Sequence, residues 1–239
     1  MVTQARIADE LRVERERLAS YLESLPEEAW ERDSLCEGWT VRELMAHVVG
    51  VASDVAHRRL EGVGTPEQNQ RQVDERRGRC PRELLDEWRE TGKLLEDGVL
   101  ALDDELWTAP YSENFTVGQA LQRMVEDIYV HGLDVRLALG DAPVEGPGLR
   151  STLEVAEREW QGRIPRLAPD VGALHVSAGD FETTVPGPGS VEVKISGDQI
   201  ALALVATGRR TLDAAVADGR LTVEPPAPAA LGEAINIYG

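Results

Sequence analysis

The sequence of 239 residues contains only two cysteines, Cys36 and Cys80, and no CxxC spacing. This scarcity excludes a disulfide framework and a cysteine-based zinc knuckle, and it fits a reducing cytoplasm. Long apolar runs are also missing: none approaches the roughly 20 residues that span a membrane. The N-terminal segment carries charges every few residues and lacks the apolar core of a signal peptide. We therefore expect a soluble, cytoplasmic protein.

Basic residues are few compared with acidic residues, 25 against 43, and the formal net charge is -18. This charge would repel the phosphates of nucleic acids and anionic membrane surfaces. The composition therefore argues against both classes of partner and favours small molecules or proteins. A chain of this length can bury one large or two modest cores, and we expect two domains.

Four segments show the 3.6-residue apolar spacing of amphipathic helices. They are residues 7–25, 40–60, 84–95 and 116–140. Two of them begin with a capping box, Thr40 with Glu43 and Thr116 with Gln119, in which side chains satisfy free backbone amides. The polar segment 61–79 could be a loop or a further helix. Four long helices predict an antiparallel bundle.

The pattern changes after the proline- and glycine-containing stretch 141–148. We expect a helix over residues 153–164, followed by short β-branched or alternating runs that predict strands. These runs are ALHVSAG, FETTVPG, SVEVKISG and LTVEPP. Residues 200–220 fit a helix or a strand equally well. The predicted domains are a helical bundle of residues 1–147 and an α+β domain of residues 148–239.

Two histidines and one aspartate are the main candidates for a reactive site. Asp127 and His131 lie four residues apart on the inward stripe of their helix, so their side chains start about 6 Å apart and can share one ion. His47 lies on the inward stripe of the second helix. Metal sites in bundles are built from facing helices, so these three residues predict a zinc site with an open fourth position. An open position is typical of catalytic sites.

These side chains also have a simpler interpretation. A histidine on an apolar face is often a core residue bonded to a neighbour, and Asp127 could simply orient His131. Glu126 is the rival carboxylate, but it lies roughly 140° around the helix from His131, and we expect it to face solvent. Spacing by itself therefore leaves a metal site and a buried hydrogen-bonded pair as alternatives.

Other reactive side chains are weaker candidates. We expect His57 at the surface and His175 on a strand. Cys36 lies beside a helix start, where the helix dipole could lower its pKa, but we expect it to be inert. Asp134 lies on the same helix as the predicted ligands and could pair with Arg136 or support a ligand.

The same residues carry a resemblance to a known family. The stretches EGWTVRELMAHVVG and VEDIYVHGLDVRLALG resemble two signatures of the mycothiol-dependent maleylpyruvate isomerase family, within the DinB-like superfamily. The signatures are GWTVxxLxxHxxG and carboxylate-x-x-x-His-G-x-D. The resemblance implies an α+β fold, with a DinB-like antiparallel four-helix bundle before a smaller C-terminal α/β domain. It implies His47, Asp127 and His131 as ligands of a divalent metal, usually zinc. The family position matched to Asp127 is commonly glutamate, one methylene longer, which bears on metal affinity and geometry.

The resemblance also implies mycothiol, a small cytoplasmic thiol of actinobacteria, as co-substrate. Coordination to a divalent cation deprotonates a thiol, which makes it a nucleophile at neutral pH. The expected function is addition of mycothiol to a small electrophile, by an isomerase of the maleylpyruvate type or an S-transferase. In the second domain the ATGRR stretch matches a substrate-binding basic residue of the family. Arg209 is thus the candidate catalytic residue and Arg210 a candidate cofactor contact, unless both are ordinary surface arginines.

Two further functions stay open at this point. A non-catalytic bundle could bind a metal or small ligand for sensing, with Asp127 and His131 as a buried pair. A hydrolase could use metal-bound hydroxide as its nucleophile and would need no thiol. The chain could act as a monomer or as a homodimer.

Overall fold

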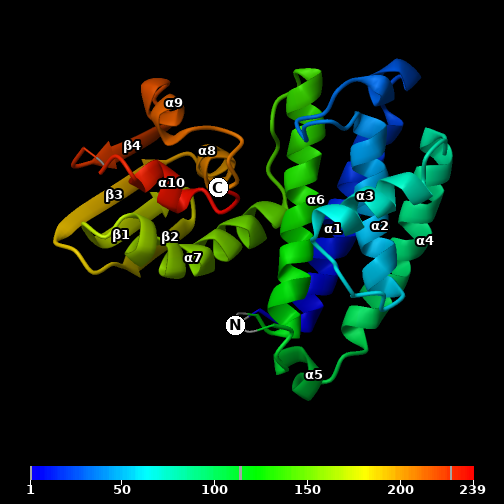
Figure 1. The fold of residues 1–239 in the computed structure, drawn as a ribbon, viewed down its shortest axis with the longest axis horizontal. Helices are drawn as coiled ribbons and strands as arrows, with labels where there is room; N and C mark the ends of the chain where they lie inside the picture. The colour runs from blue at the N-terminus through cyan, green and yellow to red at the C-terminus, as the bar shows by residue number, and fades with distance from the viewer. Residues whose placement is uncertain (1, 113–114, 227) are drawn as a thin grey trace. The chain divides into compact units, whose positions relative to one another are not determined.

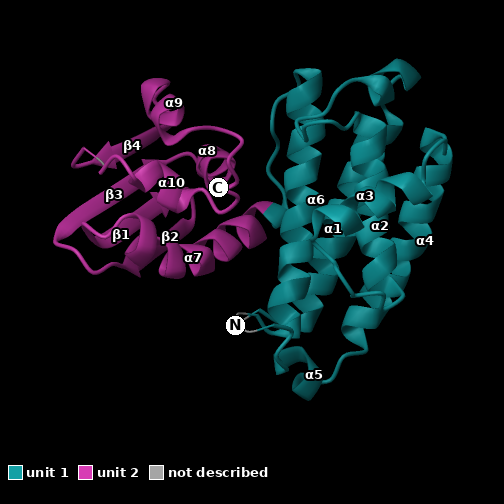
Figure 2. Ribbon diagram, in the orientation of Figure 1, with its two compact units in different colours: residues 1–148 teal, residues 149–239 magenta. Residues whose placement is uncertain are grey.

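The computed structural model describes residues 2–112, 115–226 and 228–239 (Figure 1). The chain divides into two compact units, residues 1–148 and 149–239 (Figure 2). The helices are α1 (Gln4–Glu23), η1 (Glu27–Glu31), α2 (Val41–Ala56), α3 (Pro66–Glu75), α4 (Pro81–Leu100), α5 (Asp104–Thr108), α6 (Val117–Leu139), α7 (Pro147–Leu167), α8 (Gln199–Ala206), α9 (Leu212–Ala217) and α10 (Leu231–Ile235). The strands are β1 (Val171–Ala178), β2 (Phe181–Pro186), β3 (Val191–Gly197) and β4 (Leu221–Glu224). Within the described ranges, no helix is long and apolar enough to cross a membrane.

Long helices α1, α2, α4 and α6 form the framework of the first unit (Figure 1). α1 packs against α4 and α6, and α2 packs against the same two helices. Their apolar stripes meet in one core, and burial of such stripes supplies most of the stability of helices in proteins. Fully buried side chains of this core include Leu11, Trp30, Leu44 and Trp88. This packing brings the predicted ligand-bearing helices, α2 and α6, next to each other.

Both predicted capping boxes are present. The Thr40 amide donates to Glu43 Oε2 at 2.9 Å, and the Glu43 amide donates to Thr40 Oγ1 at 3.3 Å. At α6 the Thr116 amide donates to Gln119 Oε1 at 2.8 Å. These boxes satisfy amides that have no partner inside the helix, so they fix where α2 and α6 begin. α2 ends at Ala56, before the predicted end near residue 60.

The polar segment 61–79, which the sequence left open between loop and helix, contains α3. The Thr65 hydroxyl caps it by accepting from the Gln68 amide at 3.3 Å. α3 packs against α2 at Gly50, where an added Cβ would lie only 2.4 Å from Gln72 Cβ. Glycine at this position therefore permits the close approach of the two helices, and Gln72 is completely buried between them.

A four-stranded sheet with the order β2-β1-β3-β4 forms the centre of the second unit. β1 pairs antiparallel with β2 and parallel with β3, and β3 pairs antiparallel with β4. Buried residues alternate with more exposed ones along β2 and β3, which gives the sheet one core face and one polar face. The indole of buried Trp160 in α7 donates to the Ile235 carbonyl at 2.8 Å and ties the C-terminal segment to this core. The ambiguous stretch 200–220 is mainly helical, in α8 and α9.

Replacing Thr40 with alanine is expected to lower the free energy of unfolding by about 1 kcal/mol, because the Glu43 amide loses its side-chain acceptor. Urea denaturation measures this change. Thr40→Ser keeps the hydroxyl and is expected to retain the wild-type value. Equal losses in the two variants would contradict a capping role for the hydroxyl.

Candidate metal centre

Two helices bring together the three side chains predicted to bind a metal. His47 lies on α2, and Asp127 and His131 lie one turn apart on α6. One ligand atom of each residue lies within 4.8 Å of the other two. The two imidazole rings meet edge to face, with centroids 5.5 Å apart and planes at 87°. The fold thus assembles two imidazoles and a carboxylate at one point, and metal binding by them stays a prediction.

The chemistry and spacing of these donors fit a divalent transition metal. Ligands at about 2.1 Å from a tetrahedral zinc ion are separated from one another by about 3.4 Å. His131 Nε2 and Asp127 Oδ1 lie 3.4 Å apart, which matches this edge of the tetrahedron. The Asp127 side chain keeps 29% of its surface exposed, so this side of the site is in contact with solvent.

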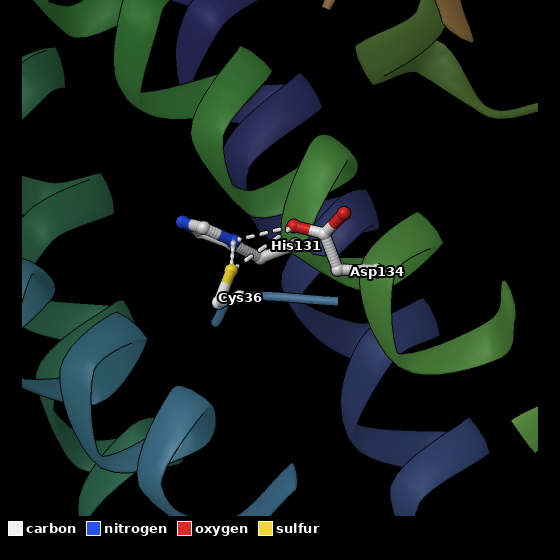
Figure 3. Close-up of side chains that lie close together, drawn as sticks. All are labelled: Cys36, His131 and Asp134. Carbon is white, nitrogen blue, oxygen red and sulfur yellow. Dashed lines mark hydrogen bonds and ion pairs between the residues drawn. The ribbon is translucent and has the colours of Figure 1, made fainter. Parts of the chain in front are cut away.

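Asp134 and Cys36 hold the other edge of the His131 ring (Figure 3). His131 Nδ1 donates to Asp134 Oδ2 at 3.0 Å, and Cys36 Sγ donates to the same oxygen at 3.5 Å. Asp134 is completely buried. Because Nδ1 is engaged in this way, Nε2 is the nitrogen that faces Asp127, an arrangement usual for metal-binding histidines. Asp134 therefore has one of the two roles expected of it, support of a predicted ligand.

Cys36, His131 and Asp134 also form a second group whose ligand atoms lie within 4.8 Å of one another. The two groups share His131, so they are not independent. Asp134 Oδ2 already accepts hydrogen bonds from both of its neighbours. We interpret this second group as the support of the His131 ring.

His47 is held in place by a residue of α3. Its Nδ1 lies 2.9 Å from Gln72 Oε1, and the Trp39 ring packs against the imidazole with centroids 5.1 Å apart. Like His131, His47 therefore uses Nδ1 for a protein partner and leaves Nε2 for the site. The sequence indicated the helix of His47 but not these partners.

Charges at the site partly offset the effect of burial. Burial raises the pKa of Asp127, but nearby cations, His131 first, outweigh it and hold that pKa below its ordinary value. Burial lowers the pKa of His131, but neighbouring groups, Asp127 first, outweigh it and hold that pKa well above its ordinary value. Burial prevails at His47, whose pKa is lowered. Without a metal, these directions favour an ionised Asp127 paired with the cationic form of His131, and the neutral form of His47.

The expectation that Glu126 faces solvent is wrong, because this side chain is only 1% exposed. α6 is buried around most of its circumference, so a position roughly 140° from His131 is also covered. Cys36 Sγ also lies 3.7 Å from His131 Nδ1, a contact that the sequence did not indicate. Its only sequence signal is its position shortly before the capped start of α2.

Arg209 and Arg210 follow α8 in the second unit. Arg209 Nη1 donates to the Thr207 carbonyl at 2.6 Å, and its guanidinium lies over the Tyr238 ring, 5.2 Å from the centroid. Arg210 is paired with Asp218. Both side chains thus have structural partners, and their roles toward substrate and cofactor stay predictions.

The two remaining histidines lie where the sequence placed them. His57 is exposed just after α2, and its Nδ1 donates to the Ser53 carbonyl at 2.8 Å. His175 lies on β1 and contacts Thr184 and Glu192 at 3.0 and 2.8 Å. Neither belongs to the group around His131.

Replacing Asp134 with asparagine is expected to lower the pKa of His131 in chelator-treated protein, which an NMR titration measures directly. A raised folded-state pKa stabilises the fold below the unfolded value of about 6.5 and loses this effect as pH rises through the folded value. The loss of stability in Asp134→Asn, about 1 to 3 kcal/mol, is therefore expected to be largest below about pH 6.5 and smaller at higher pH. Asp97→Asn, at an exposed carboxylate, is the control. A loss that does not change with pH would contradict this coupling.

Comparisons with known proteins place the chain in a family. The family model for the mycothiol maleylpyruvate isomerase N-terminal domain matches residues 11–136, more than half of the chain and including the three predicted ligands. Uncharacterised proteins from two strains of Mycobacterium tuberculosis are each 25% identical over 226 residues, 86% of this chain and 86% of their own length.

Solved structures agree on the fold. The crystal structure of the mycothiol-dependent maleylpyruvate isomerase matches with a TM-score of 0.66 and 17% identity, over 96% of this chain and 98% of that one. A histidine-to-alanine mutant of that protein matches with a TM-score of 0.65 and the same identity and coverage. With more than half of its residues matched by the family model, this chain belongs to the mycothiol maleylpyruvate isomerase family.

Proposed function

We propose that this protein is a metal-dependent enzyme that activates mycothiol for addition to a small electrophile. The observation that carries the proposal is the convergence of His47, Asp127 and His131, with ligand atoms within 4.8 Å of one another, inside the region that the family model matches. We propose zinc as the metal, because two imidazoles and one carboxylate are ligands that zinc accepts in catalytic sites.

Each residue of the site has a defined task in this proposal. When bound, a divalent cation supplies Lewis acidity that deprotonates a coordinated thiol at neutral pH. His47 and His131 would hold it through Nε2, and Asp127 through a carboxylate oxygen. Asp134 keeps the His131 ring oriented through Nδ1. The exposed part of Asp127 leaves an approach for the thiol and its acceptor.

The activated thiol serves two reactions. In an isomerase, the sulfur adds to a conjugated cis double bond, the resulting single bond rotates, and expulsion of the thiol leaves the trans product. In an S-transferase, the sulfur stays attached to the electrophile. Family membership favours the isomerase of the maleylpyruvate type, and the same side chains would support the transferase.

The proposal extends to the rest of the chain. The packing of α1, α2, α4 and α6 supports the predicted DinB-like antiparallel four-helix bundle. In the second unit, Arg209 would bind an acidic group of the substrate, because a guanidinium pairs with a carboxylate through parallel N–H donors. Arg210 would contact the cofactor. We propose a cytoplasmic location, where mycothiol is found, and a monomer or homodimer as the working form.

Replacing His47 with alanine is expected to remove bound metal and the reaction with mycothiol together, because the metal loses one of three protein ligands. Elemental analysis measures the metal, about one zinc ion per wild-type chain. Consumption of mycothiol is followed with maleylpyruvate and with a panel of electrophiles. His57→Ala removes an exposed histidine that follows the same helix and is expected to keep the wild-type metal content and rate.

Three outcomes of that experiment would count against the proposal. Unchanged metal content in His47→Ala would contradict the ligand assignment. Turnover without any added thiol would favour a hydrolase that uses metal-bound hydroxide. Protein that lacks metal and cannot be reconstituted with zinc would favour a non-catalytic bundle.

Replacing Arg209 with alanine is expected to raise KM for an acidic substrate about 10- to 100-fold, because one charge-assisted contact is lost. Metal content is expected to stay unchanged. Steady-state kinetics measure the effect, and Arg166→Ala, at an exposed arginine of the same unit, is the control. An unchanged KM in Arg209→Ala would leave this arginine without a substrate role.

A further inference from the structure

Resting on the proposed function, we propose that Gln72 and Asp54 are positioning residues for His47. Together they hold the imidazole in the tautomer that carries its hydrogen on Nδ1, so that the lone pair of Nε2 faces the metal. Neither residue belongs to the motifs that marked the site in the sequence.

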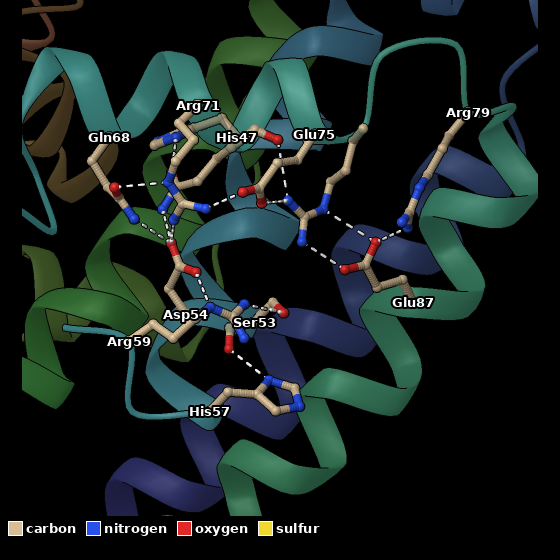
Figure 4. Close-up of polar contacts among 12 residues, drawn as sticks. His47, Ser53, Asp54, His57, Arg59, Gln68, Arg71, Glu75, Arg79 and Glu87 are labelled. Atoms are coloured by element: carbon tan, nitrogen blue, oxygen red, sulfur yellow. Dashed lines mark hydrogen bonds and ion pairs between the residues drawn. The ribbon is translucent and has the colours of Figure 1, made fainter. Parts of the chain in front are cut away.

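Asp54 is an ionised carboxylate enclosed by donors. It lies near the end of α2 and is 1% exposed, and such a group needs several partners to offset its lost hydration. Burial raises the pKa of Asp54, but the hydrogen bonds that it accepts outweigh burial and hold that pKa below its ordinary value. One donor is Gln72 Nε2, at 2.7 Å. The others, labelled in Figure 4, are Gln68 Nε2 at 2.8 Å, Arg59 Nε at 2.9 Å and Arg71 Nη2 at 3.0 Å.

The carboxylate of Asp54 decides which way the Gln72 amide faces. An amide has a donor nitrogen and an acceptor oxygen, and only the nitrogen can face an ionised carboxylate. Gln72 Nε2 therefore points to Asp54, and Oε1 is directed to the other side. The side chain is 0% exposed, so solvent does not compete for either atom.

The amide oxygen in turn decides the tautomer of His47. Gln72 Oε1 lies 2.9 Å from His47 Nδ1. A carbonyl oxygen only accepts, so Nδ1 must donate, and a neutral imidazole then has its lone pair on Nε2. The opposite tautomer would place an N–H where a metal needs an electron pair. A charge on Asp54, two contacts away, thus sets the ligand atom of His47.

The packing of α3 fixes the position of Gln72. A Cβ on Gly50, one turn after His47, would lie 2.4 Å from Gln72 Cβ, so a larger residue there would push α3 away. Arg76 Nη1 donates to the Gln72 carbonyl at 3.1 Å, and Arg76 Nη2 donates to Glu87 Oε1 of α4 at 2.6 Å. Gly50, the last glycine of the GWTVxxLxxHxxG motif, thus has a physical role, because it leaves room for Gln72, the residue that orients His47.

The test is the tautomer of His47 and the zinc affinity, measured separately. Long-range ¹H–¹⁵N correlation spectra of chelator-treated protein identify which ring nitrogen carries the hydrogen, and competition with a chelating dye gives the dissociation constant for zinc. Wild type is expected to show Nδ1–H at His47. Gln72→Met keeps the bulk of the side chain without the amide, and we expect a loss of the pure Nδ1–H form and an about 10- to 100-fold weaker zinc affinity.

Two further variants separate orientation from packing. Gln68→Met removes another donor to the same oxygen of Asp54 but has no contact with His47 among the described residues, and we expect the wild-type tautomer and affinity. Asp54→Asn keeps Gln72 in place but allows its amide to turn over, because asparagine can also donate. We expect this variant to change the tautomer of His47 as Gln72→Met does.

A wild-type tautomer and a wild-type zinc affinity in folded Gln72→Met would overturn the inference. If that variant does not fold, the spectra of Asp54→Asn decide it in the same way. Wild-type protein that binds no zinc would overturn the proposed function, whereas its tautomer spectra would still decide whether Gln72 fixes the ring.

Discussion

Two imidazole rings lie in the packed interior of the helical unit, and the nitrogens of a buried ring need partners. His47 and His131 each satisfy Nδ1 with a protein acceptor, Gln72 for His47 and Asp134 for His131. His131 directs Nε2 toward Asp127 at 3.4 Å, and Nε2 of His47 is the nitrogen that its protein partner leaves unused. The rest of the site depends on these separate roles of the two ring nitrogens. In each histidine, Nδ1 fixes the ring to the protein, and Nε2 is left to act as a ligand. The same requirement explains why polar residues with no motif of their own lie deep between α2 and α3.

This arrangement lowers stability because it buries carboxyl groups. Asp54 and Asp134 are almost or completely inaccessible to solvent, and apolar residues of similar size would pack there without the loss of hydration. Their donors offset that loss, and they hold the rings in fixed orientations. Burial of the apolar core around Leu44 and Trp88 stabilises the fold and offsets the hydration that these carboxyl groups lose. In this unit, apolar packing stabilises the fold, and buried polar contacts orient the side chains of the candidate site.

The two units carry different parts of the chemistry. The helical unit contains the three predicted ligands and the two stretches that resemble the family's signatures, and the family model matches within it. The second unit contributes a sheet with one core face and two arginines at the end of α8, of which Arg209 is stacked on Tyr238 and Arg210 is paired with Asp218. In our proposal, activation of the thiol therefore rests on residues of the first unit, whereas recognition of an acidic substrate rests on residues of the second.

The sequence by itself determined the main helices and the starts of α2 and α6, because apolar periodicity and the capping boxes at Thr40 and Thr116 are local signals. It placed the starts of α1 and α4 three residues late, at 7 and 84, because apolar spacing does not mark where a polar first turn begins. With the helix phase known, the i, i+4 spacing of Asp127 and His131 was readable too. Only the tertiary structure decided that Glu126 is buried, that residues 66–75 form a helix and that Gln72 lies against His47. These depend on segments far apart in the chain, and local spacing carries no information about which surface a neighbouring helix will cover.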